Sequence, residues 1–393
     1  MRILVYDPEH ISHSTDVVRR GLLPEMAKRV ERLVWMLPES RHEAYKDWLT
    51  GQPSIELAGF ELPRTHPGRW LDAVLRRFQG GFGVDEGGNI HRIRGRLQAQ
   101  AASLKAREIS ANWIFCPSFM NQPVPRSSIS LAGMIYDVSS SLAPRTLANI
   151  DRWIKTSSVT FSISRFTRQQ VLARLPQIDP ARVIVTPLCP DVSEGALPNP
   201  EGIVREAVGS GSLRVLCPAA LLERKGHAIL LKAAQRCADQ GDKIQLVFVG
   251  SGTQLLKQSD EQQPSWILNV RLAFDSFVEA GGAACAFGHV TDVELETLFC
   301  QADVVVFPSL FEGFGLPVAE AVQRGLPVIA SDLPPIHEQL DLFDCHDRVS
   351  LVAPGDVEAL AGALSDFAGG KAPSRQRPED MVDGRTELVR ACT

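Results

Sequence analysis

Two glutamates stand eight positions apart in a segment whose other residues are typical of a loop followed by a helix start. The segment, residues 303–332, reads DVVVFPSLFEGFGLPVAEAVQRGLPVIASD, and its carboxylates are Glu312 and Glu320. A buried strand is expected first, then a glycine-containing loop, then a helix with Pro317 at its first position. Backbone N–H groups at a helix start favour an anion, and glycines let a ligand approach the main chain closely. The segment therefore predicts a site for a diphosphate.

The two carboxylates are expected to do different jobs. Glu320, one turn inside the helix, can accept hydrogen bonds from ribose hydroxyls, and Glu312, on the loop, can orient the hydroxyls of a sugar. A second segment, residues 220–237, reads ALLERKGHAILLKAAQRC and places Arg224 and Lys225 just before a helix with an apolar period. Taken alone, the glutamates also fit a solvated helix face, and the cations fit an ordinary helix start.

Short apolar strands alternate with helical patterns along the chain, which indicates an α/β fold with mainly parallel sheets. One series lies at 2–7, 31–37, 112–118, 131–138, 159–164 and 182–188, and a second lies at 213–219, 244–250, 284–290, 303–309, 326–332 and 349–355. Pro, Gly and Ser cluster between them at 193–212, so we expect two doubly wound, Rossmann-like domains, 1–195 and 196–393. Since ligands bind at the carboxyl ends of parallel strands, two such domains facing across a cleft suit the joining of two substrates.

The segment 303–332 resembles the E-x7-E signature of retaining glycosyltransferases of the GT-B fold, particularly their family 4, the glycosyl transferases group 1. The match includes the strand, the Pro-Ser, the EGFG loop, both glutamates and the downstream G-x-P-V-I-A-S-D. FVGSGTQ at 248–254 and GHVTDVELETLFCQADV at 288–304 are similar to the family's nucleotide-side strand and turn. The resemblance implies an N-terminal acceptor-binding domain and a C-terminal donor-binding domain. Whether residues 366–393 pack back on the first domain, as in relatives, is open.

The resemblance also implies roles for particular residues. Lys225 is expected to bind the donor diphosphate and neutralise the leaving group, with Arg224 beside it. The remaining donor-binding positions are Gly250, Glu312, Gly313, Phe314, Gly315, Leu316 and Glu320, and the catalytic positions are Glu312, Lys225 and Asp137. The arginine that usually precedes the family's lysine is replaced by Ala219-Ala220, so one phosphate contact is in question.

The acceptor side is assigned to the N-terminal domain. MIYDVSSSLAP at 134–144 resembles the family element that often reads His-Asp, with Tyr136 in the histidine's place and Asp137 after it. A core tyrosine beside a capping aspartate is the alternative interpretation. Relatives often carry a Gly-rich loop after the first strand, whereas this chain reads DPEHISHSTD, where His13 is a candidate to line the same place.

Composition limits the classes of partner. The chain has 393 residues, 44% of them hydrophobic, and a formal net charge of -5, which argues against nucleic acid as a partner. The eight cysteines are scattered without zinc spacing and read as reduced thiols of a cytoplasmic protein. No stretch reaches the length of a membrane span. Residues 64–96 combine arginines with apolar side chains, which fits either peripheral contact with the inner face of the plasma membrane or a solvated amphipathic helix.

These features predict a hexosyltransferase that uses a nucleotide-diphosphate sugar and a saccharide or lipid-linked acceptor, in cell-surface polysaccharide synthesis. GDP-mannose is favoured over a UDP-hexose, because Tyr-Asp in place of His-Asp resembles bacterial surface-polysaccharide transferases. Retention of configuration follows from the family. No Asp-x-Asp occurs, so we expect neither a metal ion nor another cofactor. Two alternatives stay open: a non-catalytic nucleotide-sugar-binding subunit, and a glycoside hydrolase or phosphorylase that uses the two carboxylates.

Overall fold

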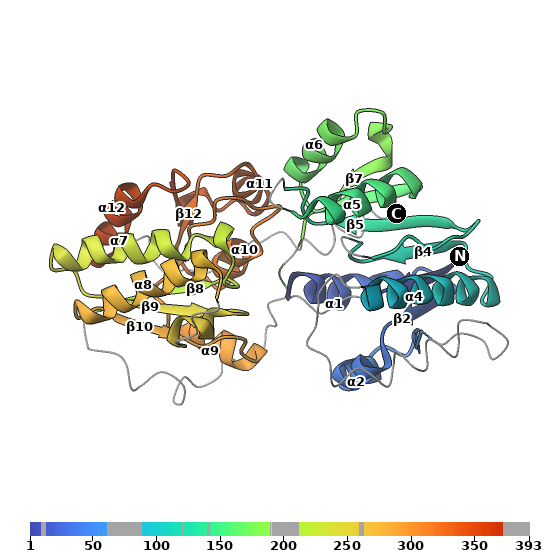
Figure 1. The fold of residues 1–393 in the computed structure, drawn as a ribbon, viewed down its shortest axis with the longest axis horizontal. Coiled ribbons are helices and arrows are strands. Elements are labelled where there is room, and N and C mark those ends of the chain that lie inside the picture. The colour runs from blue at the N-terminus through green and yellow to red at the C-terminus, as the bar shows by residue number, and fades with distance from the viewer. Residues whose placement is uncertain are drawn as a thin grey trace. The chain divides into compact units, whose positions relative to one another are not determined.

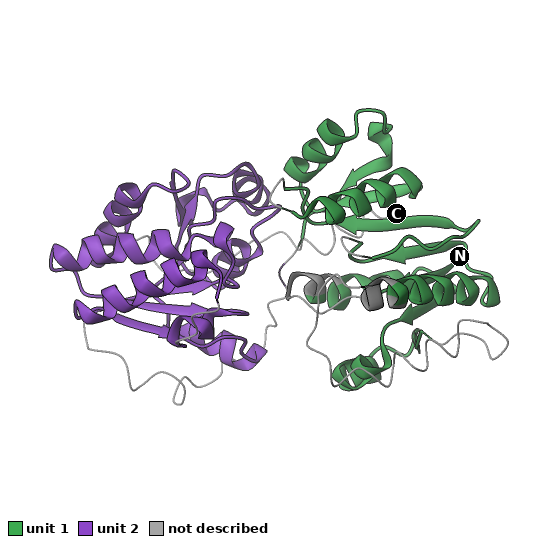
Figure 2. Cartoon of the chain, viewed as in Figure 1, with its two compact units in different colours: residues 1–189, 383–393 green, residues 190–382 purple. Residues whose placement is uncertain are grey.

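The computed structural model describes residues 1–8, 13–60, 89–119, 122–139, 142–188, 190, 212–258 and 263–371. The chain divides into two compact units, residues 1–189 with 383–393 (unit 1) and residues 190–382 (unit 2) (Figure 2). The expected boundary at 195/196, most of the Arg-rich segment 64–96 and most of the C-terminal segment 366–393 lie outside the described residues. Both units are α/β, each built on one parallel sheet (Figure 1).

Unit 1 contains a seven-stranded sheet in the order β3-β2-β1-β4-β5-β6-β7. The strands are β1 (Arg2–Tyr6), β2 (Arg32–Met36), β3 (Ile55–Ala58), β4 (Trp113–Cys116), β5 (Ser130–Ile135), β6 (Val159–Ser162) and β7 (Val183–Val185). The helices described are α1 (His13–Ala27), α2 (His42–Thr50), α4 (Asn89–Glu108), α5 (Pro144–Thr156) and α6 (Arg165–Arg174). Five of these strands fall within the ranges expected from the sequence, β5 begins one residue before its range, and β3 was missed.

Unit 2 contains a six-stranded sheet in the order β10-β9-β8-β11-β12-β13. Its strands are β8 (Leu213–Pro218), β9 (Ile244–Val249), β10 (Ala283–Ala286), β11 (Val304–Phe307), β12 (Val328–Ser331) and β13 (Val349–Val352). Its helices are α7 (His227–Asp239), α8 (Ser265–Glu279), α9 (Asp292–Gln301), α10 (Leu316–Gln323), α11 (Pro334–Phe343) and α12 (Val357–Ala368). All six strands match those expected, which confirms the doubly wound α/β class.

The strand order of unit 2 fixes where a ligand can bind. The chain runs outward from β8 through β9 to β10, then returns to β11 and runs the other way through β12 to β13. The direction therefore reverses between β8 and β11, whose residues pair in parallel. In open parallel sheets the crevice at this switch point, outside the carboxyl ends of the strands, is the usual ligand site. Lys225 follows β8 and Glu312 follows β11, so the topology places both candidates at this point.

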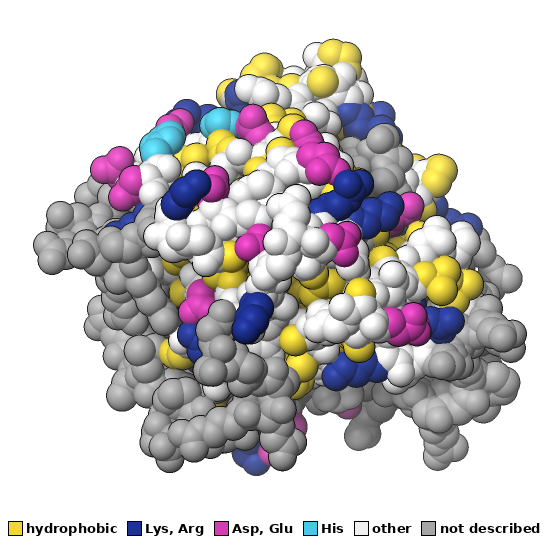
Figure 3. All heavy atoms as spheres, turned by 90° about the vertical axis from the view of Figure 1, so that its left-hand side faces the viewer, with side chains coloured by type: hydrophobic (Ala, Val, Ile, Leu, Met, Phe, Trp, Pro, Cys, Tyr) yellow, Lys and Arg dark blue, Asp and Glu magenta, His cyan; other side chains and the backbone are white. Residues whose placement is uncertain are grey.

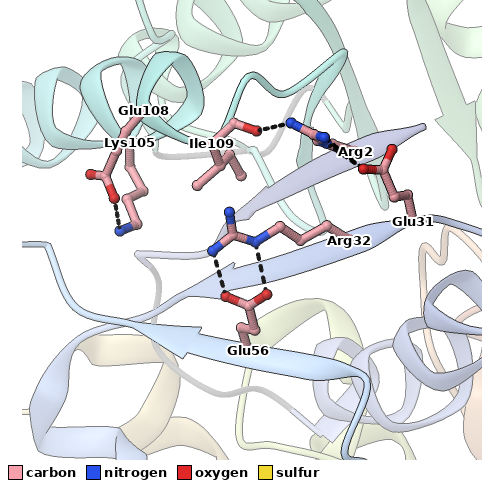
Figure 4. Close-up of polar contacts among 7 residues, drawn as sticks. All are labelled: Arg2, Glu31, Arg32, Glu56, Lys105, Glu108 and Ile109. Atoms are coloured by element: carbon pink, nitrogen blue, oxygen red, sulfur yellow. Dashed lines mark hydrogen bonds and ion pairs between the residues drawn. The ribbon is translucent and has the colours of Figure 1, made fainter.

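In unit 1, surface ion pairs lie at the edge of the sheet where the strands begin (Figure 4). Arg2 pairs with Glu31 at 2.6 Å, and Arg32 makes two 2.8 Å hydrogen bonds to Glu56. The Arg32 guanidinium lowers the pKa of Glu56 by its hydrogen bonds and its charge. These side chains join the starts of neighbouring strands, far along the strands from the carboxyl edge, and we assign them to stability. Such exposed pairs contribute little individually.

No helix among the described residues is both long enough and apolar enough to cross a bilayer.

Candidate functional site

Two loops of unit 2 meet at the switch point. The first follows β8, forms a 3-10 turn at Glu223–Lys225 and enters α7 through Gly226. The second follows β11 and enters α10 through Gly315. The loops are joined by a 2.7 Å hydrogen bond from the Leu310 N–H to the Arg224 carbonyl. A Cβ atom on Gly226 would lie 2.0 Å from the Pro308 carbonyl oxygen, so only glycine allows this approach.

Lys225 and Glu312 form an ion pair within this site. Lys225 Nζ lies 2.7 Å from Glu312 Oε1, and the two side chains are only 13% and 6% exposed. Lys225 Nζ also lies 4.9 Å from the centroid of the Phe307 ring, an aromatic contact that favours the cation. The Lys225 ammonium, held between a carboxylate and an aromatic face, can also form hydrogen bonds with the oxygens of an incoming phosphate.

Arg224 adds a second cation to the same carboxylate. Its Nη1 lies 3.5 Å from Glu312 Oε2 and donates a 3.1 Å hydrogen bond to the Phe311 carbonyl. Arg224, Lys225 and Glu312, all expected in the donor site, are therefore in contact, although their loops are almost ninety positions apart in the sequence. The two cations outnumber the one carboxylate, which leaves the cluster with net positive charge for an anionic ligand.

The start of α10 is shaped by backbone conformation. Gly315 is the N-cap residue with a φ of 92°, a left-handed conformation that other residues adopt at a cost. Its missing side chain also matters, because a Cβ there would lie 2.6 Å from Ile336 Cδ1. Pro317 is the second residue of α10, one position later than expected, and Phe314 and Leu316 on either side of Gly315 are buried.

Glu320 lies inside α10 and its side chain is 5% exposed. The last turn of α10 is tightened, since the Arg324 N–H bonds the Ala321 carbonyl instead of that of Glu320. The Glu320 carbonyl accepts instead a 2.7 Å hydrogen bond from Arg324 Nη1. Arg324 is itself held by Glu296 on α9, at 2.9 Å from Nε, and packs on the Phe299 ring. The helix that carries Glu320 is thus fixed to α9.

Gly250 directly follows β9 and lies against the loop that contains Ala219 and Ala220. Its φ is 135°, and a Cβ there would lie 2.7 Å from the Ala219 carbonyl and 2.8 Å from the Ala220 nitrogen. His227, at the first position of α7, reaches the same loop, with Nε2 3.3 Å from the Ala219 carbonyl oxygen. Burial lowers the pKa of His227 to about 4, so the imidazole is neutral. It is a structural link between α7 and this loop, and sequence reasoning missed it.

Cys217, the residue before the last of β8, is not a candidate nucleophile. It is fully buried, and burial raises the pKa of its thiol to about 12, so the thiolate form is not populated near neutral pH. The six described cysteines are all free. Among the residues that the structure describes, no group of three or more His, Cys, Asp or Glu side chains could hold a metal ion.

The acceptor-side candidates lie in unit 1, apart from the donor residues of unit 2. Tyr136 and Asp137 follow β5, and Asp137 Oδ1 accepts a 2.6 Å hydrogen bond from the Ser139 N–H, a local turn contact that caps no helix. Tyr136 interacts electrostatically with Arg19 of α1, so both lie near the carboxyl ends of the strands. His13 opens α1, and its side chain is outside the described residues.

A buried ion pair in unit 1 was not expected from the sequence. Asp7, directly after β1, accepts hydrogen bonds from Arg19 at 2.5 and 2.7 Å and from the Trp35 indole at 3.0 Å. Arg19 is 1% exposed, and burial alone would lower its pKa, but the charge of Asp7 and the hydrogen bonds to it, with smaller contributions from Tyr45 and Tyr136, together raise it. Asp7 thereby ties α1 to the sheet.

The surface on the side of unit 2 is electrostatically mixed. On the face shown in Figure 3, basic and acidic side chains are interspersed, and no extended area carries one sign.

Comparison with known proteins links these features to one family. A family model described as "Glycosyl transferases group 1" matches residues 212–368, which include every donor-side candidate. The O-antigen chain mannosyltransferase B of Escherichia coli is 36% identical over 77 residues, 20% of this chain and 19% of the relative. The MMP alpha-(1->4)-mannosyltransferase of Mycolicibacterium hassiacum is 30% identical over 140 residues, 36% of this chain and 30% of the relative. The chain thus spans less than a third of the length of either relative.

Solved structures show the same fold over the whole chain. Anabaena Alr3699/HepE in complex with UDP and glucose has a TM-score of 0.65 and 15% sequence identity, covering 100% of this chain and 98% of that one. The likeness confirms the expected GT-B architecture of two Rossmann-like domains.

Proposed function

We propose that the chain, whose residues 212–368 match the model of the glycosyl transferases group 1 family, is a retaining hexosyltransferase. It moves a hexose, mannose in preference, from a nucleotide-diphosphate sugar to a saccharide or lipid-linked acceptor. The observation that carries the proposal is the Lys225–Glu312 pair at the switch point of unit 2, beside the start of α10.

Cleavage of the donor leaves a nucleoside diphosphate with extra negative charge, and the enzyme must stabilise that charge as it develops. Lys225 and Arg224 are cations held beside the anion-favouring start of α10. When the diphosphate binds, its oxygens replace part of the contact between Lys225 and Glu312. Glu312 is then released to accept hydrogen bonds from sugar hydroxyls, while Glu320 accepts bonds from the ribose.

This chemistry needs no resident cofactor and no essential divalent ion, because protein cations take the place of the metal at the leaving group. Turnover is therefore expected to survive a chelator. Retention of configuration is proposed from the family, with the acceptor attacking on the face from which the diphosphate leaves. Asp137 and Tyr136 of unit 1 are proposed to contact the acceptor.

The mannosyl donor is proposed on two grounds. Tyr136-Asp137 replaces the family's His-Asp, and the relatives named above are mannosyltransferases, one of them of O-antigen chains. The same relative supports a role in surface polysaccharide synthesis. UDP-glucose is the next donor to try, since the solved structure with the same fold holds UDP and glucose.

The test is release of nucleoside diphosphate from GDP-mannose, UDP-glucose and UDP-galactose, with and without oligosaccharide or lipid-linked acceptors. Release that depends on an acceptor supports transfer, and hydrolysis of free oligosaccharides without nucleotide supports the hydrolase alternative. Lys225→Ala is expected to lower kcat at least a hundredfold with a smaller change in the Kd for nucleotide. Lys232→Ala, an exposed lysine of the same helix α7, is the matched control. Equal turnover in the Lys225 and Lys232 variants would remove this account of leaving-group stabilisation.

Peripheral membrane contact through residues 64–96 is a further part of the proposal. It rests on the arginines and apolar residues of that segment. Sedimentation with anionic liposomes should fall as salt is raised, because the attraction is screened. No sedimentation at low salt would retire this part and leave the transferase proposal intact.

A further inference from the structure

Gln339 is a buried amide that reaches the candidate site from the neighbouring helix α11. Its side chain is 0% exposed, and Nε2 donates hydrogen bonds to the backbone carbonyls of Phe314 and Gly315, the second at 3.2 Å. Oε1 has no hydrogen-bond partner among the described residues. The side chain of Gln339 therefore donates its hydrogen bonds to the loop that precedes α10.

These two bonds determine the direction of two backbone N–H groups. The described residues contain no cis peptide bond, and in a trans peptide the C=O and N–H groups point in opposite directions. The Phe314 carbonyl shares its peptide unit with the Gly315 N–H, and the Gly315 carbonyl shares its unit with the Leu316 N–H. Because Gln339 holds both carbonyls, both N–H groups point away from α11.

These are also the N–H groups that an anion can use. Leu316 is the first residue of α10, so its N–H has no acceptor within the helix, and Pro317 after it has no N–H. The Phe307 ring links this loop to the cation: it lies 3.3 Å from the Cβ position of Gly315 and 4.9 Å from Lys225 Nζ. Gly315 and the Lys225 ammonium thus both lie close to the Phe307 ring.

We propose that Gln339 is a positioning residue that aims the Gly315 and Leu316 N–H groups at the diphosphate of the donor. The inference rests on the proposed function and adds to it a residue that touches neither substrate. Without the amide, the Phe314 carbonyl loses the donor that Gln339 supplies in a buried place, and the Gly315 carbonyl keeps only its 2.9 Å bond from the Val318 N–H. Rotating these peptide units toward other partners turns the N–H groups away from the anion.

The test compares the binding of diphosphates with that of nucleosides, by titration calorimetry with UDP, uridine, GDP and guanosine. Gln339→Met keeps the length of the side chain and removes its donors. It is expected to raise the Kd for the preferred diphosphate about tenfold and leave the Kd for its nucleoside unchanged. Gln339→Glu, whose carboxylate repels the two carbonyls, is the second variant and should weaken diphosphate binding further. Phe343→Leu, a buried change one turn along α11, is the control for packing.

The outcomes separate the two claims. If the parent protein binds neither diphosphate better than its nucleoside, the proposed function fails and this inference fails with it. If the parent prefers a diphosphate and both Gln339 variants keep the parent's ratio of the two Kd values, the role of Gln339 is overturned and the proposed function stands. Equal loss of diphosphate and nucleoside binding, matched by Phe343→Leu, would assign Gln339 to packing alone.

Discussion

At the scale of single side chains, Lys225 and Glu312 show what residue types and their spacing can predict. The sequence predicted that both serve the donor, from the EGFG loop and the Arg-Lys-Gly element. It gave no sign that the two side chains contact each other at 2.7 Å, because the contact depends on two loops packing at the switch point. Gln339 and His227 escaped prediction for the same reason: neither belongs to a motif, and each acts through a carbonyl distant in sequence.

Glu320 is expected to contribute to binding more than to turnover. Glu320→Ala removes a carboxylate acceptor for ribose hydroxyls and should raise the Kd for nucleoside diphosphate roughly ten- to a hundredfold, while kcat at saturating donor changes little. Calorimetry and steady-state kinetics measure the two effects, with exposed Glu279→Ala as the control. A large fall in kcat at unchanged Kd would place Glu320 at the reacting sugar instead.

His227 gives a prediction about pH. Its pKa is about 4 when folded and near 6.5 when unfolded, so the unfolded chain binds the proton first as the pH falls. Its contribution to stability is therefore complete above about pH 6.5 and is lost toward pH 4, with about 2 kcal/mol lost between pH 7 and pH 5. Urea denaturation of the parent and of His227→Gln at both pH values checks this. The variant should lose less stability over this interval, and equal losses would show that His227 is not the titrating group.

Helix α10 is a short element whose stability depends on contacts with neighbouring helices. With eight residues it is too short to be stable alone, and its two ends are held by different helices, Gln339 of α11 at the start and Arg324 with Glu296 of α9 at the end. The sequence predicted the helix from its proline and glycines, but the helices that hold it could not be read from local patterns. The edge strand β3 was missed because it has only four residues and Glu56 interrupts its apolar run.

Arg324→Met tests the contact between α10 and α9. It leaves Glu296 and the Glu320 carbonyl without their donor, and because Arg324 is 8% and Glu296 24% exposed, we expect a loss of about 2 kcal/mol in the free energy of unfolding. Urea denaturation measures it. Adding Glu296→Gln should restore part of the loss, since the partner's charge is then removed. A double variant that is less stable by the sum of both single changes would show that the pair is not coupled.

For the whole molecule, the alternation of strands and helices was enough to predict two doubly wound units. Parallel sheets bury both faces, so their strands appear as short apolar runs that can be recognised without knowledge of strand order. The orders β10-β9-β8-β11-β12-β13 and β3-β2-β1-β4-β5-β6-β7 come from the structure alone. These orders place Lys225 beside Glu312, and they also place Asp7 beside Arg19 at the carboxyl end of β1.

The most direct test of the central claim, that unit 2 binds the nucleoside diphosphate of a sugar donor, is thermal unfolding of the full chain with UDP, GDP, ADP or CMP. A ligand at a hundred times its Kd adds about 2.7 kcal/mol to the folded state. We predict that one diphosphate, GDP in the first instance, raises the Tm by several degrees and that Lys225→Ala reduces the rise. An unchanged Tm with all four nucleotides at millimolar concentration would contradict the claim.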